Sequence, residues 1–110
     1  MKHPVTAAVA ACLAMTLVPA AAQDRPLLGI VSISATEANN VRYIAGATAA
    51  AEKAGWEVSV IDAAGSADQA NSAIQNFAGR GATAIIDMVF PYSSIGAGLA
   101  AARDADIPVV

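Results

Sequence analysis

Four apolar runs alternate with longer segments of helical spacing in this chain of 110 residues, and they span residues 27–33, 56–61, 82–90 and 107–110. The first and third runs are nearly continuous, which is typical of parallel strands that are buried on both faces. The second run alternates with polar residues, as an edge strand does. This alternation predicts an α/β fold, an open parallel sheet flanked by helices, in the order β-α-β-α-β-α-β.

The three segments between the runs each carry the markers of a helix. The first helix is predicted over residues 38–54, where Gly55 ends it as a left-handed cap. Its expected buried face consists of Val41, Ile44, Thr48 and Ala51. The second opens with a capping box at residues 66–69, and its apolar stripe consists of Ala70, Ala73, Ile74 and Phe77. The third begins near Ser93, buries Ile95, Leu99 and Ala102, and ends before Ile107.

Residues 1–22 have the pattern of a secretory signal peptide. Lys2 and His3 form a short basic start, residues 5–18 are an apolar run, and alanines at 20–22 suit a signal peptidase that cleaves after Ala22. The run is shorter than the roughly 20 apolar residues that span a bilayer. Two alternatives remain open, namely lipoprotein processing at Cys12 and a buried N-terminal helix. We expect an exported, periplasmic protein whose mature part, residues 23–110, is one domain.

The mature part lacks two residue types on which many enzymes depend, because the only cysteine and the only histidine, Cys12 and His3, lie in the signal. This composition excludes disulfides, thiol nucleophiles, Ser-His-Asp chemistry and zinc sites with nitrogen or sulfur ligands. The excess of acidic over basic side chains, with the basic residues spread singly, argues against nucleic acid as a partner. We therefore expect no enzyme, no cofactor and no metal site.

Polar and aromatic side chains follow the first and third predicted strands. Since the carboxyl ends of parallel strands meet at one edge, where ligands bind in open α/β sheets, we expect a binding site there. Amide, carboxylate and hydroxyl groups bind vicinal hydroxyls, and aromatic rings pack on the C–H face of a sugar. The same residue types are also ordinary loop and cap residues. The candidate ligand-binding residues are Ser34, Asn39, Asn40, Arg42, Asp87, Phe90 and Tyr92.

Residues 96–101 match the dinucleotide fingerprint G-x-G-x-x-A. That motif binds a pyrophosphate only where its glycines form the turn from a strand to a helix. Here the strand is predicted to end near Phe90 and Gly96 to lie inside the third helix, so we exclude a nucleotide site.

The ordered set of these segments resembles the periplasmic sugar-binding proteins of the ribose-binding type. The resemblance covers Leu27 to Val110 and rests on LGIVS at 28–32, Gly46, AGW at 54–56, VSVID at 58–62, DQAN at 68–71, IQNF at 74–77, GATAII at 81–86, Ala102 and IPVV at 107–110. It implies most of the first lobe of a two-lobe binding protein, cut within the fourth strand. The chain departs from the family at residues 37–40, where an aromatic pair is common, and at residues 88–92. These departures leave the identity of the sugar open, and a non-sugar ligand is an alternative.

The resemblance also implies a function. Such proteins bind a monosaccharide or related polyhydroxyl ligand between their lobes and deliver it to an inner-membrane ABC permease. One alternative is a periplasmic sensor that feeds a membrane receptor. Another is an enzyme that uses carboxylates such as Glu37, Asp62 and Asp87.

Overall fold

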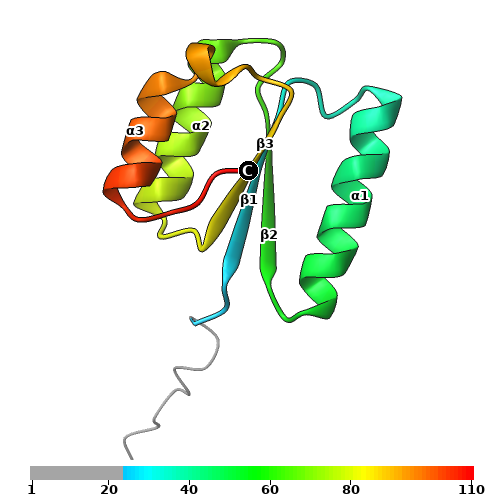
Figure 1. Ribbon diagram of the computed structural model, residues 1–110. Coiled ribbons are helices and arrows are strands. Elements are labelled where there is room, and N and C mark those ends of the chain that lie inside the picture. Colours follow the sequence, from blue (N-terminus) through cyan, green and yellow to red (C-terminus); the bar gives the residue numbers. More distant parts are fainter. Residues whose placement is uncertain (1–23) are drawn as a thin grey trace, which may run out of the picture.

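The computed structural model describes residues 24–110. The predicted signal peptide, its cleavage site and Cys12 lie outside these residues. The described part is a three-layer α/β structure, in which a parallel sheet separates one helix from two others (Figure 1). The α/β class that the sequence predicts is confirmed.

The sheet has three strands, and all of its pairings are parallel. The strands are β1 (Leu27–Ser32), β2 (Glu57–Asp62) and β3 (Ala84–Met88), in the order β2-β1-β3. Every residue of β1 is buried, as expected for a central strand that is covered on both faces. The prediction that the second apolar run forms an edge strand is also confirmed, because β2 lies at one end of this order.

The fourth apolar run is the point at which the expected order differs from the structure. Residues 107–110 form only an isolated bridge, Ile85 with Val109, rather than a full strand. The backbone is nevertheless positioned beside β3, since Asp87 N–H donates to Val110 O at 2.8 Å and Val110 N–H donates to Ile85 O at 3.0 Å. Residues 108–110 therefore lie parallel to β3, along the edge of β3 that faces away from β1.

Helices α2 (Ala67–Gly79) and α3 (Gly96–Asp104) cover one face of the sheet. Ser66 caps α2 by accepting from the Gln69 N–H, and all four predicted stripe residues of α2 are buried. Phe77 packs so closely on β1 that a Cβ on Gly29 would lie 2.6 Å from its ring. Only glycine at position 29 allows this approach between helix and strand.

The third helix begins later than expected. Ser93 lies in a 3-10 turn, η2 (Tyr92–Ser94), which is closed by the Ser94 N–H to Pro91 O bond, and α3 begins at Gly96. Gly98 packs against α2, because a Cβ there would lie 2.9 Å from Ile74 Cβ. The glycines of residues 96–101 therefore belong to a helix and its packing, so this segment has no strand-to-helix turn of the kind that binds dinucleotides.

Helix α1 (Ala38–Lys53) covers the opposite face and is packed less tightly. It contains no fully buried residue. Ile44, Ala47 and Ala51 are half-buried against a small cluster formed by Leu28, Ile30 and Met88. Val41, which the helical period places on the buried face, is 47% exposed, and it belongs to neither hydrophobic cluster of residues 24–110. Within residues 24–110, no helix has the length and apolar character needed to span a membrane.

Candidate functional site

The loop from β1 to α1 is held in place by its own side chains. Glu37 caps α1, because its carboxylate accepts from the backbone N–H groups of Asn39 and Asn40. The Asn40 side chain donates from Nδ2 to Ser34 O at 2.8 Å. These bonds fix the first turn of α1 beside the carboxyl end of the sheet, where the sequence predicts a binding site.

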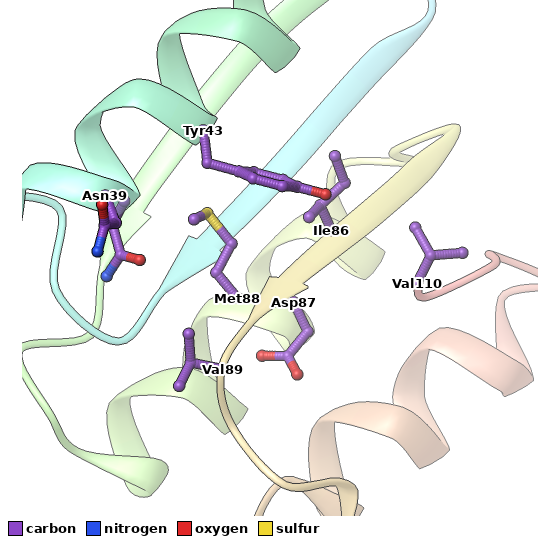
Figure 2. A pocket seen from close by; sticks show the side chains of 8 residues that line it. Asn39, Tyr43, Ile86, Asp87, Met88, Val89 and Val110 are labelled. Atoms are coloured by element: carbon purple, nitrogen blue, oxygen red, sulfur yellow. The ribbon is translucent and has the colours of Figure 1, made fainter.

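A cavity of about 380 Å³ opens at this end of the sheet, between α1 and the end of β3. Its volume is within the range of small-molecule sites. Figure 2 shows the Tyr43 ring and Asn39 on the side of α1, and Asp87 and Val89 at the end of β3. The lining residues are Asn39, Asn40, Tyr43, Ile86, Asp87, Met88, Val89 and Val110.

Three of the seven candidate residues line this cavity together, namely Asn39, Asn40 and Asp87. Ser34 is connected to them through its carbonyl oxygen, which Asn40 binds, while its hydroxyl lies 3.3 Å from Thr36 Oγ1. Arg42 lines an adjoining cavity, of which Tyr43 and Ile86 form the shared wall. The structure thus gathers residues from two distant segments, 34–43 and 86–89, at one edge.

The two aromatic candidates lie elsewhere. Phe90 belongs to the hydrophobic core and is only 6% exposed. Tyr92 is 55% exposed on the turn that precedes α3 and is not among the residues that line the cavity. A contact of either ring with a ligand stays a prediction.

Among the lining residues that the sequence analysis did not name, Tyr43 is the aromatic one. Its side chain is 62% exposed, and Figure 2 shows its ring extended over the cavity. Asn39 and Asn40 precede it by four and three residues on the same helix, so the three share one helical face. This spacing could have identified Tyr43 from the sequence, because a residue three or four positions after a candidate on a helix lies on the same face.

Two buried side-chain oxygens have no hydrogen-bond partner within residues 24–110, and both lie at the carboxyl ends of strands. They are Ser32 Oγ at the end of β1 and Asp87 Oδ1 near the end of β3. Buried polar atoms are nearly always hydrogen-bonded in proteins, so an unpartnered atom calls for an explanation. Asp87 is a lining residue of the cavity, whereas Ser32 is fully buried and is not.

Burial also changes the electrostatics of Asp87. Desolvation raises the pKa of its carboxyl above the ordinary value of 3.8, and the backbone N–H of Phe90 offsets part of this effect. No basic side chain is among the residues that line the cavity. The ionised carboxylate is therefore held at a cost that a nearby hydrogen-bond donor or cation would reduce.

The backbone is strained next to this carboxylate. Val89 has φ of 83°, in the left-handed region that β-branched residues rarely adopt. Its side chain is 65% exposed and lines the cavity. Strain of this kind is concentrated at functional sites, where the surrounding structure imposes it.

The segment that follows is anchored by Asn71 of α2. Its Nδ2 donates to Ser94 O at 3.1 Å and its Oδ1 accepts from Gly98 N–H at 2.7 Å. This side chain joins η2 and the first turn of α3 to α2. Among residues 24–110, no three Asp, Glu, His or Cys side chains lie close enough to hold a metal ion.

The geometry can be compared with known proteins. No protein-family model matches the sequence, and no curated protein matches it significantly. Solved structures do match. An ABC transporter solute-binding protein from Mycobacterium smegmatis, with bound glycerol, has a TM-score of 0.71 and 25% identity over 77% of this chain. The chain has the fold of these binding proteins. The resemblance predicted from the sequence is confirmed, and the fold is like that of the first lobe of such a protein.

Two further structures agree. A second Mycobacterium smegmatis protein, in complex with β-D-fucofuranose, has a TM-score of 0.64 and 28% identity over 76% of this chain. An ABC transporter solute-binding protein from Agrobacterium vitis, with bound allitol, has a TM-score of 0.69 and 24% identity over 77% of it. The chain spans 30%, 28% and 29% of the length of these three proteins, in the order given.

Proposed function

We propose that residues 23–110 form the first lobe of an exported solute-binding protein, which binds a neutral sugar or polyol and delivers it to an ABC permease of the inner membrane. In this proposal residues 1–22 direct export to the periplasm and are removed. The protein binds its ligand without converting it. The ligand is held between this lobe and a second one, and its binding shifts a hinge equilibrium toward the closed form.

The observation that carries the proposal is the meeting of Asn39, Asn40, Tyr43 and Asp87 around one cavity at the carboxyl edge of a parallel sheet. Amide and carboxylate groups hydrogen-bond the hydroxyl groups of a polyol, and an aromatic face packs on its C–H groups. The edge itself is where open α/β sheets bind ligands. Together these groups supply both kinds of contact that a polyhydroxyl ligand requires.

The molecules bound to the structural neighbours support the same ligand class. Glycerol, β-D-fucofuranose and allitol each carry several hydroxyl groups and no charge. We assign this class to the present chain because its cavity offers the corresponding groups, and we leave the individual sugar open.

The test is isothermal titration calorimetry of the full-length protein with a series of neutral sugars and polyols, including glycerol, allitol, sorbitol, glucose and ribose. We expect at least one of them to bind. Asn39→Ala should weaken that binding about tenfold, since a ligand hydroxyl loses its hydrogen-bond partner. The matched control is Asn76→Ala, an exposed asparagine on α2 away from the cavity, which should bind like the wild type.

Two results would contradict the proposal. One is the absence of binding to every compound in the series by a protein that is shown to be folded. The other is binding that Asn39→Ala leaves unchanged, because the ligand would then occupy a different place.

A further inference from the structure

Val89 follows β3 directly, and its backbone has a φ that three glycines of the described chain share. Its φ is 83°, and the values for Gly55, Gly65 and Gly81 are 84°, 79° and 72°. Among residues 24–110 it is the only β-branched residue with a positive φ. Glycine adopts such values without steric cost, whereas the branched Cβ of valine conflicts with them. A side chain is therefore kept at this turn in spite of the strain that it causes.

The packing on either side of Val89 accounts for the turn of the backbone. Met88 is buried in the cluster under α1, and Phe90 is buried in the core on the α2 side. A regular strand would place residues 88 and 90 on the same face of the sheet. The left-handed residue between them directs the two side chains to opposite faces. This explains the φ of Val89 but not its side chain, because glycine would turn the chain equally well.

The side chain of Val89 contributes little to the core. It is 65% exposed, and it packs in neither hydrophobic cluster of the described chain. It lines the cavity together with Asn39 and Asn40. In Figure 2 it lies on the same side of the β3 end as Asn39, whereas Asp87 projects on the other side. Burial of the valine therefore does not offset the strain, and the cavity wall is the place where this side chain can act.

We infer that Val89 is a specificity-determining residue, whose two methyl groups limit the bulk of the ligand and favour an unsubstituted sugar or polyol over its O-methyl ethers. The inference rests on the proposed function, because it concerns the ligand of the same cavity. Met88 and Phe90 are both 6% exposed, and Met88 O accepts from Ile33 N–H at 3.2 Å. These anchors hold the turn on both sides, so the valine does not move aside for a larger ligand.

Calorimetry on the full-length protein tests the inference with glycerol, allitol, sorbitol, glucose and ribose, each compared with its mono-O-methyl ethers. The ethers add one carbon and no charge, and together they place that carbon at each hydroxyl group in turn. For a compound that binds, we expect at least one ether to bind about tenfold more weakly than its parent, as one added carbon does in a filled apolar pocket.

Substitutions at position 89 locate this discrimination. The ratio of parent to ether affinity should fall in Val89→Ala and approach about one in Val89→Gly, because the methyl groups that meet the ether are removed. Val89→Ile keeps the β-branched Cβ, and with it the backbone strain, while it adds one carbon, so its ratio should exceed that of the wild type. A role in folding alone would change stability, or the affinity for every compound by one factor, and would leave the ratio unchanged.

The matched control is Val60→Ala on the edge strand β2, where the valine is 38% exposed and does not line the cavity. It should keep the wild-type ratio. Far-ultraviolet circular dichroism and a thermal melt establish that each variant is folded.

The outcomes separate this inference from the proposed function. Ethers that all bind the wild type as tightly as their parents overturn the inference and leave the proposed function standing. A ratio that is the same with isoleucine, valine, alanine and glycine at position 89, or that changes equally in Val60→Ala, does the same. The absence of binding by every parent compound and every ether overturns both.

Discussion

The two faces of the sheet are built in different ways. On one face, α2 buries Ala70, Ala73, Ile74 and Phe77, and α3 packs against α2 through Gly98. On the other face, α1 buries no residue fully, and Tyr43 is 62% exposed. The apolar contacts that hold the fold are thus concentrated on the α2 and α3 side. The α1 side contributes fewer buried apolar contacts to the stability of the fold, and it presents polar and aromatic groups to the cavity.

The largest expected effect compares an aromatic residue from each face. Phe77→Ala should lower the free energy of unfolding by about 3–5 kcal/mol, because it opens a cavity in the core against β1. Tyr43→Ala removes a ring that is mostly in solvent and should cost less than about 1 kcal/mol. Denaturant unfolding of both variants measures the difference. Equal losses would mean that the two faces contribute alike.

Substituting alanine for one glycine on each face should change the stability of the protein in opposite directions. Gly29→Ala places a Cβ 2.6 Å from the Phe77 ring and should destabilise the protein by about 1–3 kcal/mol. Gly46→Ala lies within α1, where nothing would lie within 4 Å of the new Cβ, and should stabilise it by about 0.5–1 kcal/mol through helix propensity. Thermal and denaturant unfolding should show shifts in opposite directions. Shifts of the same sign would contradict this account of the packing.

The strained turn at the cavity gives a smaller effect. Val89→Gly removes the steric conflict of a β-branched residue at φ of 83° and should raise the free energy of unfolding by about 1 kcal/mol. Val89→Ala is the control, since it shortens the exposed side chain and keeps a Cβ in the left-handed region. If both variants have the same stability, the strain is not stored at this residue.

The smallest effect is the pH dependence that Asp87 contributes. Its pKa is raised in the folded state, so the folded protein binds this proton more tightly than the unfolded chain does. The free energy of unfolding therefore loses a contribution as pH rises from the ordinary value of 3.8 through the folded pKa. Asp87→Asn lacks this loss, so its stability relative to the wild type should increase with pH across that window. Urea unfolding at several pH values measures it, and a constant or decreasing difference would contradict the burial of the carboxyl.

Sequence patterns predicted α2 better than α1, and the reason is physical. The stripe of α2 matches a helical period, and all four of its residues are buried because β1 and α3 cover it. The period of α1 is weaker, and Val41 of its predicted buried face is 47% exposed. Periodicity shows which residues share a face, but it does not show how far the neighbouring elements extend over that face.

The candidate site was predictable to a similar degree. The sequence placed Asn39, Asn40 and Asp87 at one edge because the carboxyl ends of parallel strands meet there, and the structure shows them lining one cavity. Phe90 was named for its position in the loop, but the left-handed turn at Val89 precedes it and its ring is buried in the core. Tyr43 was missed because its place over the cavity depends on how α1 lies against β3, which is a property of the tertiary structure.

The central claim, that ligand binds at the α1 side of the carboxyl edge, is tested most directly by hydrogen exchange with mass spectrometry on the full-length protein. Exchange is compared with and without a neutral sugar or polyol that calorimetry shows to bind. We predict that, within this lobe, the ligand protects peptides covering residues 34–43 and 86–90 and leaves α2, residues 67–79, unchanged. Protection confined to α2 and α3, with none in residues 34–43, would contradict the account.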